Sequence, residues 1–310
     1  MKEQEGEIQR GIEPFHNHEL EQNHKIAVAT TTFYKGWLAS NIGKTDNADQ
    51  LRGDLAIEAI MLAKDKGYQL VIVDGGSSGE FKDKFTEAGI KIVDQQEQGM
   101  SAGRRQTFKE ASVLQGVEVI CWTEPEKISM IGNLHGAAKP ILEGGADIVI
   151  PTRTEESYKT YPSLQARSEK RANQLFSQVL RLCELLSADS PYLDVFFGPR
   201  IFRNSPEILQ LFTRRYQLKP GSFKKASVRP DNYLNTTFFP IILALEQNLR
   251  VTSFVIDYIH PPKQTQFETG NTGFDEKRRR QKIDIVSGAI QLARLLIKNP
   301  NKLSELLLSD

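Results

Sequence analysis

The chain has the length, composition and charge of an ordinary globular protein. It has 310 residues, 39% hydrophobic and 25% charged, enough to bury a full core as one large domain or two small ones. Its 40 Lys and Arg nearly balance its 39 Asp and Glu, so no global field would draw it to nucleic acid or an anionic membrane. A cationic function must come from local clusters.

The first residues are polar and acidic, without the apolar core of a signal peptide. We predict a disordered extension over residues 1–24. No stretch approaches the roughly 18 to 20 apolar residues of a membrane span. Cys121 and Cys183 have no metal or disulfide-framework spacing, which predicts free thiols in a reducing compartment. We therefore expect a cytoplasmic protein without a membrane span.

From residue 25 onward, short β-forming runs alternate with helical segments, which is typical of an α/β fold with a mostly parallel central sheet flanked by helices. In the first half, strands are predicted at 25–31, 68–74, 90–94, 117–123 and 146–151. The segment 54–67 has apolar residues at helical spacing and ends in Gly67, a common helix terminator.

The second half is less regular. A polar loop at 152–162, which we expect to be mobile, precedes a long predicted helix at 163–186. The following elements are then predicted: a strand within 193–203, a helix opened by Ser205 and Pro206, a late strand at 250–259 and a terminal helix at 275–298. No linker divides the chain, which predicts a single domain over 25–310.

Ligands of open parallel sheets bind outside the carboxyl ends of the strands, so the residues that follow each strand are informative. The first strand ends in Thr30, Thr31 and Thr32, small hydrogen-bonding groups suited to a ribose or a base edge. The second ends in Asp74 and a Gly-Gly-Ser-Ser turn, and its carboxylate could accept from a base or a ribose hydroxyl. An ordinary turn with a helix cap is the alternative.

After the third strand, Gly99 and Ser101 open a helix that carries Arg104 and Arg105 in its first turn. Arginine at that end opposes the helix dipole, so we expect an anionic partner, either Asp74 or a nucleotide phosphate. A solvated basic face is the alternative.

The fourth strand leads into Glu124-Pro125-Glu126. In extended geometry the two carboxylates project to the same side, and the proline stiffens the link between them. Such a pair can hold a hard divalent cation that neutralises a diphosphate leaving group. The alternative is a strand exit followed by a helix N-terminus, where acidic residues are favoured.

The order of these motifs resembles the GT-A nucleotide-sugar glycosyltransferases, especially family 2 and the dolichyl-phosphate mannose, glucosyl-3-phosphoglycerate and mannosylglycerate synthases. AVATTTF is similar to the family's first-strand motif, VIVDGGSSGE to its aspartate strand exit, and GMSAGRRQTFKEA to its glycine-arginine helix start. WTEPEK falls where the family has Asp-x-Asp, and GGADIVIPTR is similar to the next strand. The resemblance covers about residues 25–260. It implies a GT-A (Rossmann-like) fold with a nucleotide-binding half at 25–150 and an acceptor-binding half at 151–310.

The resemblance also implies individual roles. The nucleotide contacts would be Thr31, Thr32, Asp74, Gly99 and Arg104, with Glu124 as a ribose or metal neighbour. Glu126 would be the direct metal ligand, and His260, at the end of the late strand, would reach the same metal. Two departures stand out: glutamate replaces aspartate at both acid positions, and Gly75 replaces the second acid of the strand exit.

We therefore expect a hexosyltransferase that uses Mn²⁺ or Mg²⁺ and a UDP- or GDP-hexose donor. The cation on Glu126 and His260 would stabilise the departing diphosphate. Arg153 or the basic run Lys277-Arg278-Arg279-Arg280 would add positive charge, a solvated helix face being the alternative for that run.

The acceptor is expected to be a small hydroxyl compound, and an anionic one such as a glycerate derivative would fit the arginines. The 152–162 loop and Arg200 would recognise it. Asp194 is the candidate base for a reaction that inverts the anomeric configuration. The position of His260 at the end of the late strand instead resembles the retaining glycerate-type enzymes, which favours retention of the configuration. A non-catalytic nucleotide- or sugar-binding protein is the alternative function. The oligomeric state stays open, a homodimer being one alternative.

Overall fold

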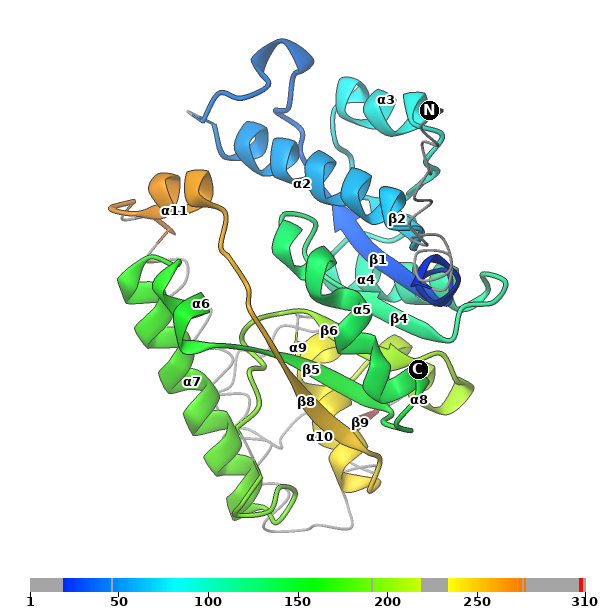
Figure 1. Ribbon diagram of the computed structural model, residues 1–310, viewed down its shortest axis with the longest axis vertical. Coiled ribbons are helices and arrows are strands. Elements are labelled where there is room, and N and C mark those ends of the chain that lie inside the picture. The colour runs from blue at the N-terminus through cyan, green and yellow to red at the C-terminus, as the bar shows by residue number, and fades with distance from the viewer. Residues whose placement is uncertain are drawn as a thin grey trace, which may run out of the picture.

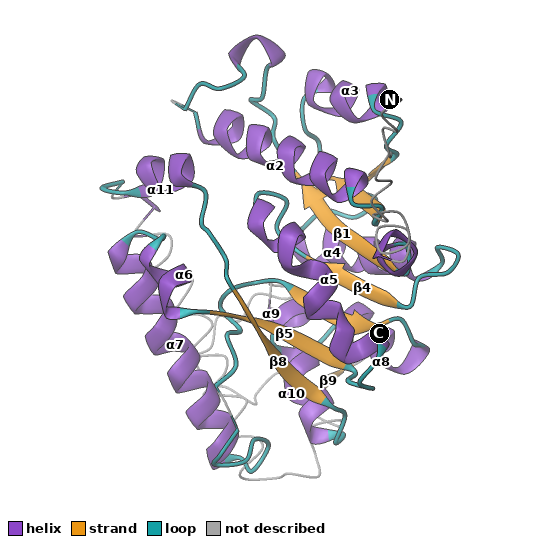
Figure 2. Cartoon of the chain, viewed as in Figure 1, coloured by secondary structure: helices purple, strands orange, loops and turns teal. Residues whose placement is uncertain are grey.

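A mostly parallel seven-stranded sheet forms the centre of the computed structural model (Figures 1 and 2), which describes residues 19–45, 47–190, 192–218, 234–271, 273–274, 276 and 307–308. The strands lie in the order β3-β2-β1-β4-β6-β5-β8. Their bounds are Ile26–Thr32 (β1), Gln69–Asp74 (β2), Ile92–Asp94 (β3), Val119–Trp122 (β4), Ile148–Arg153 (β5), Arg200–Arg203 (β6) and Val251–Ile256 (β8). Only β6 runs antiparallel to its neighbours in this sheet, β4 and β5.

Helices cover both faces of this sheet. Their bounds are Ala48–Asp65 (α2), Gly79–Glu87 (α3), Met100–Ser112 (α4), Ile128–Leu142 (α5), Glu155–Lys159 (α6), Ser163–Leu182 (α7), Pro206–Thr213 (α8), Leu234–Thr237 (α9), Phe239–Glu246 (α10) and Pro262–Glu268 (α11). A short 3₁₀ turn, η1, covers Ala39–Asn41. Apart from the main sheet, β7 (Gln217–Leu218) pairs with β9 (Leu307–Leu308).

Side-chain caps fix where several helices begin. The Asn47 side chain accepts from the Asp49 amide at the start of α2, and Ser78 accepts from Phe81 at the start of α3. Ser205 does the same for α8, with a proline in the first turn, as the sequence predicts. Such caps satisfy amide groups that have no partner within the helix.

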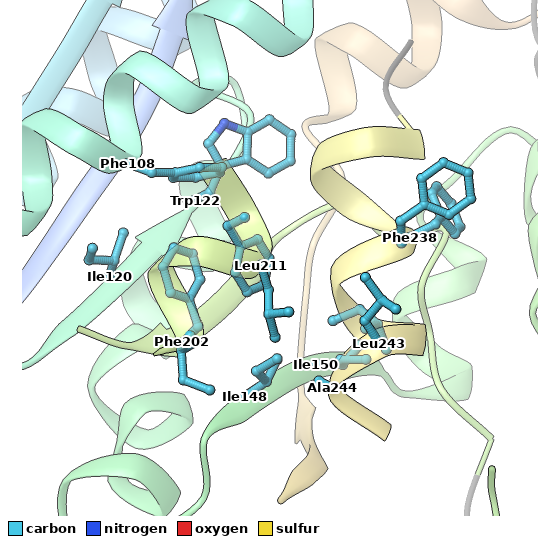
Figure 3. Close-up of a cluster of buried hydrophobic side chains, with 14 of the residues drawn as sticks. Phe108, Ile120, Trp122, Ile148, Ile150, Phe202, Leu211, Phe238, Leu243 and Ala244 are labelled. Carbon is cyan, nitrogen blue, oxygen red and sulfur yellow. The ribbon is translucent and has the colours of Figure 1, made fainter. Parts of the chain in front are cut away.

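The core has a layer on each side of the sheet. One layer packs α4, α8 and α10 against one face and includes Phe108, Trp122, Phe202 and Phe238 (Figure 3). The other layer packs α2 and α5 against the opposite face through small and aliphatic residues such as Val28, Ala59 and Leu134. Alternate residues of β1 and β4 serve the two layers, because side chains alternate along a strand.

The predicted α/β architecture is confirmed, and every strand predicted in the first half is present with bounds shifted by a few residues. Two predictions were wrong. The 152–162 segment is not a mobile loop, since β5 continues to Arg153 and α6 follows, capped by the Thr154 hydroxyl. The strand predicted within 193–203 covers only its last residues, because Gly198 has a φ of +108° and Pro199 lacks an amide proton.

Two predicted segments fall mainly outside the described residues. The terminal helix at 275–298, with Lys277 and Arg278, is one of them. The predicted extension at 1–24 is described only from residue 19, and residues 19–23 are helical. Within the described ranges, no helix has both the length and the apolar character needed to span a bilayer.

Candidate functional site

The carboxyl ends of β1 and β4 define the site. On one side of β1 the next strands in the sheet are β2 and then β3. On its other side β4 is the neighbour, followed by β6, β5 and β8. β1 pairs in parallel with both β2 and β4, so this is the point where strand order reverses. Ligands of open α/β sheets bind in the crevice at such a point. The Thr30 hydroxyl joins the two strand ends by donating to the Thr123 carbonyl at 2.9 Å.

Asp74, at the end of β2, organises the turn beside this crevice. It is 2% exposed and accepts from Thr32 Oγ1 at 2.8 Å and from the amides of Gly76 and Ser77 at 2.9 Å each. Burial alone would raise the pKa of Asp74, but the hydrogen bonds from Ser77 and Thr32 outweigh burial and hold the pKa below its ordinary value. Asp74 therefore stays ionised and shapes the turn, while its predicted contact with a nucleotide stays a prediction.

The α4 helix begins beside β1, as the glycine and small residues of its first turn allow. Gly99 has a φ of +111°, and a Cβ on Gly103 would lie 3.3 Å from Thr31 Cγ2. Arg104 is 7% exposed, and its guanidinium carbon lies 4.0 Å from the centre of the Trp122 ring. Stacking on an aromatic face thus supports the arginine that opposes the helix dipole. The nucleotide contacts predicted for Thr31, Thr32, Gly99 and Arg104 stay predictions.

Glu126, the predicted metal ligand, is buried against two partners at this crevice. It is 3% exposed, and its Oε1 accepts from the Tyr34 hydroxyl at 2.8 Å and lies 2.5 Å from Arg52 Nη2. Tyr34 follows β1, and Arg52 lies in the first half of α2. Burial, then the charge of Glu126, raises the pKa of Tyr34 well above its ordinary value, so the phenol stays protonated and donates.

Glu124, the other acid of the motif, has different neighbours. A Cβ on Gly198 would lie 2.3 Å from Glu124 Oε1, so this carboxylate lies directly against the glycine backbone before β6. Its Oε2 accepts no hydrogen bond and is 3.9 Å from Lys127 Nζ. The Lys127 ammonium also lies over the rings of Phe197 and Tyr258, at 4.6 and 5.5 Å from their centres.

His260 follows β8 and packs inside the protein. It is 4% exposed, its ring stacks on Tyr161 with centres 4.2 Å apart, and its Nε2 is 3.6 Å from a Glu268 carboxylate oxygen. The charge of Glu268 also acts on Arg52, the partner of Glu126, and raises the pKa of Arg52 together with the larger effect of Glu126. The α11 helix, which carries Glu268, packs beside α2 (Figure 1).

These donors do not fit a divalent cation as they are arranged. A hard cation needs several oxygen or imidazole ligands that converge on one point. Instead, Glu124 and Glu126 have separate cationic neighbours, and within the described part of the chain no three His, Cys, Asp or Glu residues are grouped to hold a metal. The metal roles of Glu126 and His260 stay predictions.

Asp194 and Arg153 form a buried pair away from solvent. Asp194 is 0% exposed and Arg153 2%, and Asp194 Oδ2 and Oδ1 accept from Arg153 Nε and Nη2 at 2.8 Å each. Asn173 Nδ2 donates to Asp194 Oδ1 at 2.6 Å, and Glu169 accepts from Arg153 Nη1 at 2.7 Å. Burial raises the pKa of Asp194, but the Arg153 charge and hydrogen bonds lower it below its ordinary value. The geometry supports a structural role for this pair rather than the predicted base and phosphate contact.

Arg200 is also committed to the protein interior. It is 0% exposed, and its guanidinium donates to the carbonyls of Val195, Gly198, Pro199 and Thr237 at 2.7 to 3.0 Å. Desolvation lowers its pKa to about 10, and the nearby carboxylates partly offset this effect. Arg200 therefore holds the turn that places Gly198 against Glu124, while its predicted acceptor contact stays untested.

Comparisons with known proteins are informative at the level of fold. No protein-family model matches the sequence, and no curated protein matches it. The structure is similar to glucosyl-3-phosphoglycerate synthase from Mycobacterium tuberculosis, with a TM-score of 0.51 and 12% identity over 90% of this chain and 83% of that one. A complex of the same synthase with UDP gives a TM-score of 0.52 and 10% identity over 87% of this chain and 81% of that one. The chain has the GT-A fold. A further complex, with Mn²⁺, UDP-glucose and phosphoglyceric acid, gives a TM-score of 0.48 and 10% identity over 86% and 88% of the two chains.

The sequence reasoning missed the groups that pair with the predicted ligands. These are Tyr34, Arg52, Lys127 and Glu268. Lys127 directly follows the acidic motif and could have been noticed as its counter-charge. Arg52 could not, because nothing in the sequence of its helix distinguishes it from a solvated polar residue until α2 is placed beside α5.

Proposed function

We propose that this protein is a nucleotide-sugar glycosyltransferase that moves a hexose from a UDP-hexose to a hydroxyl group of a small acceptor. The observation that carries the proposal is the set of strand exits at the reversal point of a GT-A sheet: the Asp74 turn, the α4 start and the Glu124-Pro125-Glu126 turn lie there together. A synthase with the same fold was crystallised with UDP, which supports this donor nucleotide.

The proposed reaction breaks the bond between the anomeric carbon and the diphosphate oxygen, which leaves with the electron pair. The acceptor hydroxyl oxygen forms the new bond to the anomeric carbon, and its proton passes to the leaving phosphate or to water. The enzyme has to orient donor and acceptor, exclude water and stabilise the charge that develops on the diphosphate. Arg52 and Lys127, which pair with the two glutamates after β4, are cations that could do so.

Retention of anomeric configuration is the outcome that we propose. An inverting reaction needs a positioned carboxylate that takes the acceptor proton. The sequence candidate, Asp194, has both oxygens engaged with Arg153 and no exposure, which weakens the inverting alternative. The anomeric proton signals of the product in NMR would decide between the two outcomes.

The acceptor that we propose is small and anionic, in keeping with the name of the synthase of the same fold. Arg153 and Arg200 are paired inside the protein, so the described cations left for such an acceptor are those of the crevice itself. The divalent cation implied by the sequence resemblance stays a prediction. Because the donor arrangement does not fit it, no step of the proposed reaction runs through a metal.

A panel of UDP- and GDP-sugars tests the proposal. We expect one UDP-hexose to raise the thermal unfolding temperature and to release UDP when glycerate-type acceptors are added. Asp74→Asn is expected to reduce the UDP release at least about tenfold, since the ionised carboxylate organises the turn. Lys84→Gln, in an exposed pair on α3, is the charge-changing control and should behave as wild type.

The alternative, a non-catalytic nucleotide- or sugar-binding protein, is favoured by one observation: Asp194, Arg153 and Arg200 are all committed to internal partners. It predicts stabilisation by a nucleotide sugar without any UDP release over long incubation. A complete lack of response to every nucleotide would contradict both functions.

A further inference from the structure

The two glutamates of the Glu124-Pro125-Glu126 turn have separate cationic partners. Glu126 is paired with Arg52 at 2.5 Å, and Glu124 has Lys127 at 3.9 Å. We infer that Arg52 and Lys127 together take the place of a divalent cation in this site, so that a nucleotide diphosphate binds against them without a metal. This inference rests on the proposed function and concerns the same site.

The charges of the two arrangements are equivalent. Two carboxylates with a bound divalent cation have a net charge of zero. Two carboxylates with one arginine and one lysine also have a net charge of zero. The site therefore needs no additional cation to present the same net charge to a diphosphate. A divalent cation added to the existing set would instead be repelled by Arg52 and Lys127, which already pair with the two carboxylates.

Arg52 is anchored at one end and accessible. Its side chain is 42% exposed, whereas the Glu126 side chain that holds it is 4% exposed. Its Nε is buried and has no hydrogen-bond partner. A guanidinium presents five N–H donors in a rigid fork that matches phosphate oxygens. Since Glu126 engages only part of this fork and Nε is buried, the donors on the exposed part of the guanidinium are those that an anion could reach.

The Tyr34 hydroxyl completes the anchor. It donates to the same Glu126 oxygen that Arg52 contacts, at 2.8 Å. Burial, followed by the charge of Glu126, keeps the pKa of this phenol high, so Tyr34 holds Glu126 without adding charge. The carboxylate is thus fixed between β1, β4 and α2 and can support Arg52 in one orientation.

Lys127 is held beside the turn in a similar way. Its side chain is 15% exposed, and its ammonium lies 4.6 Å from the centre of the Phe197 ring. Desolvation would lower the pKa of Lys127, but the neighbouring charges together, that of Glu124 being the largest, raise the pKa above its ordinary value. Lys127 therefore stays protonated at neutral pH, next to a Glu124 oxygen that accepts no hydrogen bond.

Arg52 also interacts with acids on which a shared metal would depend. Its charge interacts with Glu126 directly and with Glu268 at longer range, and Glu268 is the acid beside His260. A metal ion bound by Glu126 and His260 would compete with this guanidinium for the Glu126 carboxylate and would leave Arg52 without its buried partner if it won. Leaving a charged group without its partner is costly, so the displaced state is disfavoured.

Calorimetric titration with UDP tests the inference. We expect wild-type protein to bind UDP in EDTA with an affinity within about threefold of that measured with Mn²⁺. Arg52→Gln is expected to weaken UDP binding in EDTA by about tenfold, because a charge-assisted contact to phosphate is lost. Arg52→Lys should weaken it less, since the charge remains and only the fork is lost.

Lys64→Gln is the matched control, because it removes one positive charge from the last turn of the same helix. It should bind UDP as wild type does. Thermal unfolding of each variant checks that it is folded, and Arg52→Lys provides the measurement should Arg52→Gln not fold.

Three outcomes would overturn the inference. UDP binding that is detected only with Mn²⁺ would leave the proposed function standing and remove the inference. Unchanged UDP binding by folded Arg52→Gln, or by folded Arg52→Lys where Arg52→Gln does not fold, would do the same. No UDP binding in either condition would contradict both the inference and the donor proposed for this protein.

Discussion

Residues at the ends of β1, β2 and β4 are held in part by partners from other elements. Glu126 is fixed by Tyr34 and Arg52, and Asp74 by Thr32 and Ser77. The same is true of the buried pair of Asp194 and Arg153, which joins the end of β5 to the segment before β6. These contacts give direct expectations for single substitutions.

Replacing Asp194 by Asn is expected to destabilise the fold by about 3 to 5 kcal/mol, because it leaves the buried Arg153 charge without its main partner. Urea unfolding at pH 7 would measure the loss. Lys159→Gln removes an exposed partner of Glu156 and should change stability by less than about 1 kcal/mol. A loss no larger than that of the control would contradict the structural role of the pair.

Stability is also expected to fall in acid. The pKa values of Asp74 and Asp194 lie below their ordinary values in the folded state. Their contribution is therefore fully present above the unfolded-state pKa, about 4, and is lost as the pH falls through the lower folded-state values. Urea midpoints measured at pH 7, 5, 4 and 3 should decline mainly below pH 4, and Asp194→Asn should decline less steeply. If the urea midpoints of wild type and Asp194→Asn fell equally steeply with decreasing pH, Asp194 would not be a source of the acid sensitivity.

At the scale of elements, the turn before β6 and the turn after β4 fit together. Gly198, with φ of +108°, brings its backbone against the Glu124 carboxylate, and Arg200 fixes the turn through main-chain carbonyls. The antiparallel pairing of β6 with β4 places these two turns side by side. One side of the crevice is thus built by a segment that lies more than 70 residues further along the chain, as the numbering of Glu124 and Gly198 shows.

Gly198→Ala tests this contact. The added Cβ would lie 2.3 Å from Glu124 Oε1 and would also strain a backbone that L-residues rarely adopt, so we expect a loss of about 1 to 3 kcal/mol and weaker UDP binding. Gly132→Ala is the control: it lies within α5 and meets no atom within 4 Å, so stability should be equal or slightly higher. Urea unfolding and UDP titration give the two readouts, and an unaffected Gly198→Ala would show that the turns are not in close contact.

The elements were largely predictable from sequence, whereas the partners of the site residues were not. Alternating β-forming and helical runs locate β1, β2 and β4, and the strand exits follow from them. The burial of Asp194 and Arg200 depends on β6 inserting antiparallel between β4 and β5, which hydrophobic pattern alone does not indicate. In the same way, the pairing of Arg52 with Glu126 requires α2 to pack beside α5, a tertiary contact without a local sequence signal.

At the scale of the whole molecule, the sheet brings chemistry-bearing residues from distant segments to one crevice. The segment after β1 contributes Tyr34, α2 contributes Arg52, and the turn after β4 contributes Glu124, Glu126 and Lys127. The chain shares the GT-A fold with a synthase that was crystallised with UDP. The central claim that we propose is one of place: the nucleotide diphosphate binds where strand order reverses between β1 and β4.

Hydrogen–deuterium exchange with and without UDP tests that claim most directly. We expect UDP to slow exchange of amides in residues 30–36, 74–78 and 122–128, at the carboxyl ends of β1, β2 and β4, while amides at the opposite ends of these strands exchange as before. If UDP slowed amide exchange only in other segments and left these three unchanged, the nucleotide would not bind at the point where strand order reverses.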